Sequence, residues 1–514
     1  MDRGKDIGFD YRSTRGDDTR QFALAVELVT LPVDLIVTCG VLDARGKASD
    51  NDDSDRDRLY WTQHLREDRD MKIAFVNQPI DTILPPYQSS IGACTYGAAS
   101  VIAKFCDVVV YGTRDRHMDF PADLRNHNIH FRFFSVSPAE RLAAKAKEKY
   151  SKLFPLAAPA SSSNWLFRAF GRQVATDLRL QACDLIHVQH CCQYLPVIRA
   201  LNPNAKIVLQ LHAEWFSQNR PEILEKRLRH VDLVTTVSDH ITQKTRRQFP
   251  MLRNRCKTMY NAIDAVEFSR ERDRRIPARR EKRILYAGAV SPHKGVHVLL
   301  DAFSLVVKEF PDVRLDVIGP HGIYPMAETF ELRERELIET VYQFYAYDWV
   351  PKLKAKLGLT PADAGTYLAH LKQRLSAEAR GKVVFLGFVP RPTLVDHYYD
   401  ADLFAFAPIW NEGFGIPPVE AMAAGVPVVA TRAGAIPEIV KDQQTGFLVT
   451  KNNPRALADN ILKLLRDDDL REKMGRAARC WALENFTWDR AAERMYRCYS
   501  NLCGITAPAE ISAF

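Results

Sequence analysis

The sequence lacks the cysteine spacing of a zinc site or of a disulfide framework. Its ten cysteines are scattered, and none stands in a C-x-x-C pair, the spacing that such sites usually show. Cys191 and Cys192 are adjacent and lie close to His187 and His190, but neighbouring cysteines after a strand are more often reduced loop residues than metal ligands. We therefore expect no bound metal, and a reducing, cytoplasmic compartment.

The chain also has no long, uncharged apolar run. The best candidate, residues 22–42, contains Glu27 and Asp34 and is interrupted by Pro32, whereas a membrane-spanning helix needs about 20 mostly apolar residues. The arginines ahead of this run resemble the basic start of a signal peptide, but the acidic residues interrupt the apolar segment that should follow. The sequence therefore predicts neither a transmembrane helix nor a signal peptide.

Charge is unevenly distributed along the chain. Residues 1–70 carry 11 basic and 16 acidic side chains, so that residues 71–514 hold a net charge of +13, against +8 for the whole chain. No nucleic-acid module with interleaved aromatic residues is present. Residues 71–95 have no G-x-G-x-x-G motif, which argues against a dinucleotide-dependent oxidoreductase. The basic excess favours an anionic nucleotide ligand or an anionic membrane surface.

The first 70 residues differ in composition from the rest. Residues 50–58 read Asp-Asn-Asp-Asp-Ser-Asp-Arg-Asp-Arg, and so polar a run buries too little apolar surface to fold. An apolar strand then begins at Lys72. We predict that residues 1–70 form a poorly ordered leader, and Met71 is a second candidate for the start of the protein.

From residue 71 onward, short apolar runs alternate with helical stretches. Such alternation is typical of parallel sheets that helices cover on both faces, and 514 residues are too many for one core. We therefore predict an α/β protein with two such sheets. The expected strands are residues 72–77, 107–111, 185–189, 206–211, 232–237, 284–288, 314–318, 383–386, 403–409 and 426–430.

Residues 410–439 are the most informative part of the chain. Glu412 and Glu420 lie eight positions apart, with a glycine turn at residues 413–415 between them. The turn joins an apolar strand to a helix that begins at two prolines. Backbone N–H groups at a helix start bind negatively charged or hydroxyl-rich ligands, and ionised carboxylates accept hydrogen bonds from hydroxyls. The pattern favours a sugar and ribose site over a capped helix with two solvated glutamates.

This segment resembles the donor-binding signature of the retaining family 4 glycosyltransferases, also described as glycosyl transferases group 1. The resemblance implies a GT-B fold, in which two Rossmann-like domains face each other. It also implies that Glu412 contacts the transferred sugar as a catalytic residue and that Glu420 binds the ribose of the nucleotide. The residues expected to offer backbone amides to the sugar are Gly413, Phe414, Gly415 and Ile416.

Residues 284–303 resemble the pyrophosphate loop of the same family. They read as a strand that ends at Gly288, a glycine loop and an amphipathic helix. The resemblance implies that Lys294 neutralises the leaving diphosphate. Ala289 stands where the family commonly has an arginine, so that one expected cation is missing. His293, or an arginine of the basic linker that precedes this segment at residues 270–280, is a candidate to replace it.

Two positions in the first half also resemble family site residues. Gly92 lies in the loop after the first strand, which in the family faces the donor phosphates, although a plain strand-to-helix turn explains it equally well. His212 ends a strand at the sheet edge where open α/β sheets bind ligands. The resemblance places His212 beside the transferred sugar and the acceptor as a second catalytic residue; a structural histidine is the alternative. His187 and His190 are further candidates for the same cleft.

The expected domain boundaries follow from these segments. A Rossmann-like acceptor-side domain covers residues 71–268, and a nucleotide-sugar-binding domain covers residues 281–485. A last helix, residues 486–503, is expected to pack back on the first domain. Residues 322–380 are expected to form a helical insertion, whose many aromatic residues fit either an acceptor or partner surface or a self-packed hairpin.

The resemblance implies a retaining hexosyltransferase that moves a sugar from a nucleotide-diphosphate sugar to a carbohydrate or lipid-linked acceptor, in polysaccharide, glycolipid or glycoconjugate synthesis. It implies front-face attack without a metal or other cofactor, the nucleotide-sugar being a substrate. A metal-dependent GT-A enzyme is not expected, because no Asp-x-Asp pair leaves a predicted strand; Asp400-Ala-Asp402 enters one. A non-catalytic GT-B protein that binds a nucleotide-sugar is the alternative.

A peripheral membrane contact at the inner face of the membrane is expected at residues 138–153. Ser137, Pro138 and Glu140 resemble a helix start with a capping box. An apolar stripe beside a basic face suits adsorption to anionic lipid, and the alternative is that the stripe packs on its own domain. The stripe comprises Ala139, Leu142, Ala143, Ala146, Tyr150 and Leu153, and the basic face comprises Arg141, Lys145, Lys149 and Lys152.

Removal of residues 1–70 tests the predicted leader. A protein that starts at Met71 is expected to keep its melting temperature and its activity, because the acidic run contributes nothing to a core. Scanning calorimetry of both forms checks this expectation. Failure of the shortened protein to fold contradicts it.

Overall fold

A computed structural model describes residues 71–85, 88–113, 129–153, 167–214, 221–270, 281–321, 339, 341, 344 and 367–505. The predicted leader at residues 1–70, the charged linker at residues 271–280 and most of the predicted insertion lie outside these residues. Within the predicted insertion, the structure describes residues 339, 341, 344 and 367–380.

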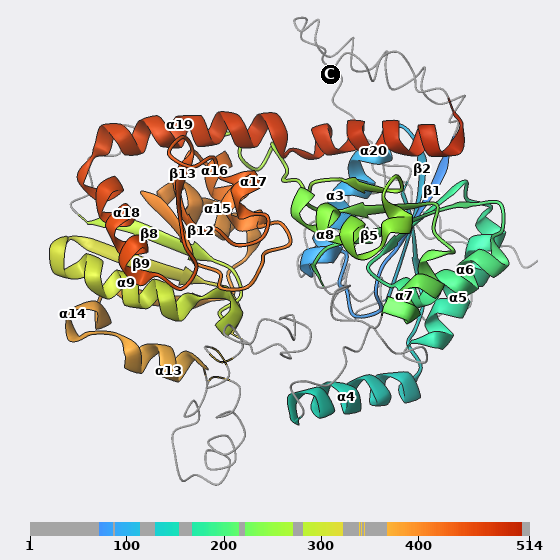
Figure 1. The fold of residues 1–514 in the computed structure, drawn as a ribbon, viewed down its shortest axis with the longest axis horizontal. Helices are drawn as coiled ribbons and strands as arrows, with labels where there is room; N and C mark the ends of the chain where they lie inside the picture. The colour runs from blue at the N-terminus through green and yellow to red at the C-terminus, as the bar shows by residue number, and fades with distance from the viewer. Residues whose placement is uncertain are drawn as a thin grey trace, which may run out of the picture. The chain divides into compact units, whose positions relative to one another are not determined.

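The first sheet has seven parallel strands in the order β3-β2-β1-β4-β5-β6-β7 (Figure 1). Its inner strands are almost wholly buried, because helices cover both faces. All five strands expected here are present. Two edge strands were not predicted: β3 alternates between buried and less buried positions, and β7 has only three residues. The strands are β1 (Lys72–Val76), β2 (Asp107–Gly112), β3 (Ile129–Phe133), β4 (Leu185–Gln189), β5 (Lys206–Leu211), β6 (Leu233–Thr236) and β7 (Cys256–Thr258).

The second sheet has six parallel strands in the order β10-β9-β8-β11-β12-β13. Two expected strands are shorter than predicted, because Pro408 and Pro427 have no N–H group for the ladder. The two sheets confirm the predicted α/β fold. The strands are β8 (Lys282–Ala287), β9 (Val313–Ile318), β10 (Val383–Gly387), β11 (Leu403–Phe406), β12 (Val428–Thr431) and β13 (Gly446–Val449).

Several helices begin at a side chain that caps their first turn. Ser89, Ser238, Asn453 and Asp467 each accept the N–H of the residue three positions further on, as capping residues do. None of the helices in the described part of the chain is long and apolar enough to cross a membrane. The helices are α3 (Ser90–Ile102), α4 (Pro138–Leu153), α5 (Arg168–Gln181), α6 (Leu195–Leu201), α7 (Pro221–Leu228), α8 (Asp239–Gln248), α9 (Val296–Glu309), α13 (Tyr367–Arg374), α14 (Ala377–Arg380), α15 (Arg391–Asp400), α16 (Ile416–Ala423), α17 (Ile436–Ile439), α18 (Pro454–Arg466), α19 (Asp468–Asn485) and α20 (Trp488–Cys503).

The strand order reverses once in each sheet. β1 lies between β2 and β4, and β8 lies between β9 and β11. Ligands of open α/β sheets bind at the carboxyl ends of the strands beside such a reversal. Gly92 follows β1, Gly288 follows β8 and Glu412 follows β11, so the topology brings predicted donor residues to both reversals.

The last two described helices, α19 and α20, pack beside different sheets. α19 packs against α16, beside the second sheet, whereas α20 packs against α3 of the first (Figure 1). The chain between them is fixed by Ile263, whose N–H donates to the Phe486 carbonyl at 2.8 Å and whose carbonyl accepts the Trp488 N–H at 3.0 Å. Gly97 lets the ring of Trp488 lie directly against α3, since a side chain there would collide with it.

α20 also covers His187, which lies in the middle of β4. Nδ1 of His187 lies 2.5 Å from the hydroxyl oxygen of Tyr499, and both side chains are fully buried. Burial lowers the pKa of His187 to about 3, so its ring is neutral and shares one hydrogen bond with the Tyr499 hydroxyl. The expectation that His187 lines the cleft is therefore wrong, because its side chain faces α20.

The described aromatic residues of the insertion pack into a core. The ring of Phe344 lies 4.9 Å from His297 on α9, 5.1 Å from Tyr367 and 5.0 Å from His370, measured between centroids. The Tyr367 hydroxyl is hydrogen-bonded to Nδ1 of His297 at 2.9 Å. Phe344 and Tyr367 thus cover α9 and do not form a surface patch; the other aromatic residues of the insertion lie outside the described part.

Replacing Tyr499 with phenylalanine tests the attachment of α20. The change leaves the buried Nδ1 of His187 without its hydrogen-bond partner, which costs about 1–3 kcal/mol of unfolding free energy. Urea denaturation measures the loss. Asn501→Ala, at an exposed position of the same helix, is the control and should change stability by less than about 0.5 kcal/mol. An unchanged unfolding midpoint for Tyr499→Phe would contradict this account.

Candidate functional site

A glycine turn lets the segment that contains Glu412 lie directly against His212, at the end of β5. Gly415 has a φ of 109°, in a region that only glycine adopts readily. At Gly413, a side-chain carbon would collide with the carbonyl oxygen of His212, and at Gly434 with the backbone of Glu412. Gly413 and Gly434 therefore let the segments around His212, Glu412 and Gly434 touch. The two predicted catalytic residues, His212 and Glu412, thus come from segments in direct contact.

Glu412 is buried and paired with Lys294. Its Oε1 lies 2.6 Å from Nζ of Lys294 and accepts the indole N–H of Trp410, also at 2.6 Å. The ammonium group lies 4.8 Å from the centroid of the Trp410 ring, within the range of a cation–π contact. A carboxylate held this way keeps lone pairs for further hydroxyl donors.

The backbone around Lys294 is fixed by the end of β11. Gly295 has a φ of 66°, and a side chain there would collide with the Ala407 carbonyl. The carbonyl of His293 accepts the N–H of Ile409 at 3.1 Å. The predicted diphosphate loop and the predicted sugar loop therefore form one packed unit.

The loop after β8 contains no replacement charge for the missing arginine. Gly288 has a φ of 146°, and its N–H donates to the Ile318 carbonyl at 2.9 Å. The Tyr286 hydroxyl donates to the Ala289 carbonyl at 2.9 Å. Burial, with Lys294 nearby, lowers the pKa of His293 well below its usual value. The suggestion that His293 supplies the missing charge is wrong, because its ring is neutral; most of the linker arginines lie outside the described residues.

Glu420, on α16, is held by two donors from α15. The Tyr398 hydroxyl donates to Oε2 at 2.7 Å, and Nη1 of Arg391 pairs with Oε1. Burial and the adjacent carboxylate raise the pKa of Tyr398 well above its usual value, so it stays a donor. We did not predict Arg391 or Tyr398, because nothing in the spacing of a helix indicates which carboxylate its side chains meet.

His212 is half-buried among polar groups. Its Nε2 lies 2.7 Å from Oε1 of Gln189, and its backbone N–H donates to Nδ1 of His190 at 3.3 Å. Burial lowers the pKa of His212 to about 4 and that of His190 well below its usual value. Both rings are therefore neutral at pH 7, with the His212 proton on Nε2, directed to the glutamine.

Gly92 lies in the first turn of α3, where its N–H already has an acceptor. That N–H donates to Oγ of Ser89 at 3.0 Å, and the Ser89 hydroxyl donates to Oδ1 of Asp81 at 2.9 Å. A side chain on Gly92 would collide with the Thr82 carbonyl. Close packing of the loop after β1 thus explains the glycine.

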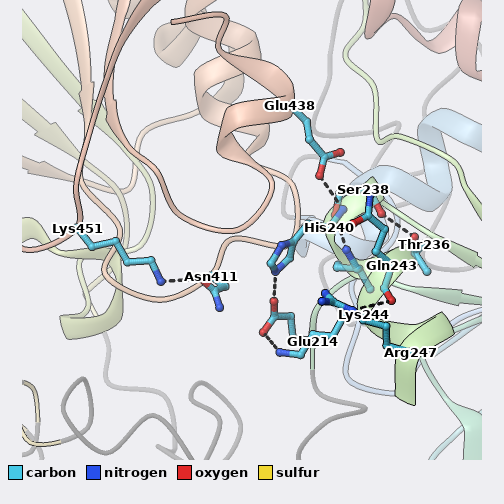
Figure 2. Close-up of polar contacts among 11 residues, drawn as sticks. Glu214, Thr236, Ser238, His240, Gln243, Lys244, Arg247, Asn411, Glu438 and Lys451 are labelled. Atoms are coloured by element: carbon cyan, nitrogen blue, oxygen red, sulfur yellow. Dashed lines mark hydrogen bonds and ion pairs between the residues drawn. The ribbon is translucent and has the colours of Figure 1, made fainter. Parts of the chain in front are cut away.

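Glu438, on α17, caps the first turn of α8 (Figure 2). Its carboxylate accepts the N–H of Asp239 at 2.8 Å and that of His240 at 2.7 Å, which suits the positive end of a helix. The ring of His240 contacts Glu214, which also accepts from Lys244 at 2.6 Å. Burial alone would raise the pKa of Glu214, but these two donors lower it. Glu438 therefore links α17 to α8, and through them the second sheet to the first.

The assembled groups suit an anionic, hydroxyl-rich ligand. A lysine beside a helix start stabilises developing negative charge, and two buried carboxylates accept hydrogen bonds from hydroxyls. Among the described residues, no three His, Cys, Asp or Glu side chains are grouped so that they could hold a metal ion.

Two family matches cover most of the described chain. Residues 107–267 match the family described as Glycosyltransferase Family 4, and residues 269–481 match the family described as Glycosyl transferases group 1. The first stretch contains His212, and the second contains Lys294, Glu412 and Glu420. Together they cover more than half of the 514 residues.

Several characterised proteins are similar in sequence. Spore coat protein SA of Bacillus subtilis is 27% identical over 63% of this chain and 80% of its own length. The D-inositol 3-phosphate glycosyltransferase of Corynebacterium diphtheriae is 34% identical over 43% of this chain and 42% of its own. The phosphatidyl-myo-inositol mannosyltransferase of Mycobacterium tuberculosis is 30% identical over 46% of this chain and 51% of its own.

Solved structures share the fold. HepE from Anabaena, solved in complex with UDP and glucose, has a TM-score of 0.52 and 20% identity and covers 84% of this chain and 99% of its own. Sucrose-phosphate synthase from Thermosynechococcus elongatus has a TM-score of 0.58 and 17% identity, with the same coverage. These likenesses concern the fold alone and confirm the predicted GT-B arrangement. The two family matches show that the chain belongs to the family 4 glycosyltransferases (glycosyl transferases group 1).

Proposed function

We propose that this glycosyltransferase moves a hexose from a nucleotide-diphosphate sugar to an acceptor hydroxyl with retention of configuration. The observation that carries the proposal is the buried pair of Glu412 and Lys294 at the glycine turn, with Glu420 on the following helix. The pair sets a hydroxyl acceptor beside a cation, as the sugar and diphosphate of one donor require. Glu420, oriented by Arg391, receives the ribose hydroxyls.

The proposed reaction depends on stabilising the leaving diphosphate. Lys294 and the backbone N–H groups of the loops after β8 and β11 supply fixed positive charge where negative charge develops, which lowers the barrier more than mobile water does. In this proposal no resident metal is needed. The acceptor hydroxyl attacks the face from which the diphosphate leaves, in a cleft that excludes water, and neutral His212 lies at its side. Glu412 binds the sugar and is not assigned as a nucleophile.

The nature of the substrates is part of the proposal. Uridine is the first base to test, because a protein of the same fold was solved with UDP and glucose. Two similar proteins are named for an inositol phosphate and for a phosphatidyl-inositol acceptor. We infer a polyol, carbohydrate or lipid-linked acceptor that the synthesis of a polysaccharide, glycolipid or glycoconjugate would use.

A thermal-shift screen of UDP-, GDP- and ADP-sugars, followed by transfer and hydrolysis assays, tests the function. Three substitutions then separate the roles. Glu420→Gln should weaken nucleotide binding roughly 10–100-fold, as expected for a lost charged hydrogen bond. Glu412→Gln should lower kcat roughly 100-fold, since its partner is the reacting sugar. Lys294→Met should impair both, because its charge serves the bound and the departing diphosphate.

Glu472→Gln, at an exposed position of α19, is the control and should behave like the parent protein. Normal transfer by all three variants would place the site elsewhere. Donor binding without transfer or hydrolysis would instead favour a non-catalytic nucleotide-sugar-binding protein. No binding of any nucleotide-sugar would overturn both functions.

We also propose that α4 contacts an anionic membrane surface. The capping box is present: the Glu140 N–H donates to Oγ of Ser137 at 3.2 Å, and Glu140 accepts the Ser137 N–H at 3.4 Å. On the apolar stripe, Ala139 and Ala146 are exposed and Leu142 is 70% exposed. A stripe packed on its own domain would bury these positions, so their exposure supports the membrane reading.

Charge reversal on α4 tests this contact. The parent protein should sediment with phosphatidylglycerol vesicles and not with phosphatidylcholine vesicles, and salt should release it. Lys145→Glu, Lys149→Glu and Lys152→Glu together should weaken binding at least about 100-fold, since each lysine near the surface contributes about 1 kcal/mol.

The matched control reverses Arg455, Lys473 and Arg476, three exposed positions on α18 and α19. It carries the same change in net charge and should still bind. Equal loss in both triple variants would indicate attraction by net charge alone, and undiminished binding by the α4 variant would rule out this helix as the contact.

A further inference from the structure

Arg391 contacts two carboxylates from different parts of the chain. Its Nε lies 3.1 Å and 3.0 Å from the two carboxylate oxygens of Glu267, and its Nη2 lies 2.5 Å from Oε2 of the same residue. Its Nη1 pairs with Glu420. The guanidinium group is a rigid fork with five N–H donors, so it holds both carboxylates in one fixed mutual geometry.

Glu267 lies in the segment at residues 264–269, which leaves the first sheet after β7 and which we call the hinge segment. Its neighbour Phe268 is fully buried, and its ring lies 6.3 Å from Tyr398 and 6.4 Å from Tyr399 on α15. The Phe268 carbonyl accepts from Nη2 of Arg479 at 2.8 Å. The hinge segment is therefore anchored on the same helix that supplies Arg391.

We propose that Arg391 is a positioning residue that couples the donor carboxylate Glu420 to Glu267 of the hinge segment, so that donor affinity depends on Glu267. This inference rests on the proposed function, which assigns the ribose to Glu420. It adds a determinant outside the 410–439 motif and connects the nucleotide site to the segment that leaves the first sheet after β7.

Glu267 and Glu420 compete for the N–H donors of Arg391, and this competition is the physical reason for the coupling. Glu267 takes Nε and Nη2 of Arg391, so Glu420 is paired through Nη1, and its other oxygen is held by Tyr398. Without Glu267, the fork is free to turn and bind Glu420 through both nitrogens. Such bidentate pairing is strong and directional, and it occupies the lone pairs that ribose hydroxyls need. Loss of Glu267 should therefore weaken donor binding.

A double-mutant cycle tests the coupling. Glu267→Gln keeps the shape and removes the charge, and Arg391→Lys keeps the charge and removes the fork. Each should weaken UDP binding by titration calorimetry, and raise the KM for the nucleotide-sugar, about tenfold, with kcat changed by less than about threefold. The double variant should be no worse than Arg391→Lys alone.

The chain offers a matched control in Asp396, which also lies on α15. It pairs with Arg270, just beyond the hinge segment, at 2.8 Å, and both side chains are more than half exposed. Asp396→Asn removes a carboxylate between the same two parts of the chain without touching Glu420. It should leave the Kd for UDP and the KM unchanged.

Hydrogen exchange of the ligand-free protein separates this inference from the proposed function. Glu267→Gln should slow exchange in α16, residues 416–423, because Arg391 then holds Glu420 through two nitrogens, and it should speed exchange in the hinge segment, whereas Asp396→Asn should leave α16 unchanged. If no nucleotide binds the parent protein, the proposed function fails, and the exchange result still decides whether the coupling exists. Unchanged exchange in α16, or additive effects of the two variants on UDP binding, would overturn the coupling.

Discussion

The contact between the Gly413 turn and the His212 carbonyl is the constraint on which the site depends. The His212 carbonyl lies so close to Gly413 that this position tolerates no side chain. Gly434 likewise packs directly against the backbone of Glu412. Polar residues of both sheets thereby meet without long, flexible side chains. A site built from backbone contacts is rigid, so its geometry costs little reorganisation when charge develops.

Each of four carboxylates in this region contacts a lysine or an arginine. Lys294 pairs with Glu412, Arg391 with Glu420 and Glu267, and Lys244 with Glu214. In the proposed reaction, a diphosphate attracts Lys294 away from Glu412, while the sugar hydroxyls provide new donors to the carboxylate. The two halves of the donor thus support each other, because each compensates the group that the other releases.

Much of the fold could be predicted, because buried parallel strands are continuous apolar runs of the right length. The exceptions have local causes: β3 is an edge strand with polar positions, β7 is very short, and prolines shorten β11 and β12. The motif residues could be predicted as candidates because a glycine turn lies between Glu412 and Glu420 in the sequence. The partners of those residues could not: Arg391 and Tyr398 lie on an ordinary helix, and His187 looks like a cleft residue until α20 is seen to cover it.

The return of the chain from the second sheet to the first has a consequence for synthesis. His187 and Tyr499 are 312 positions apart, and the core between β1, β2 and α3 contains α20 residues such as Met495 and Tyr496. Domains generally fold as they leave the ribosome, amino-terminal part first. Here one apolar face of the first sheet stays exposed until α20 has been made. The contact that covers this face closes a very long loop. The first sheet therefore completes its core only after the 312 positions between His187 and Tyr499 have been made, which ties the stability of the first sheet to the integrity of α20.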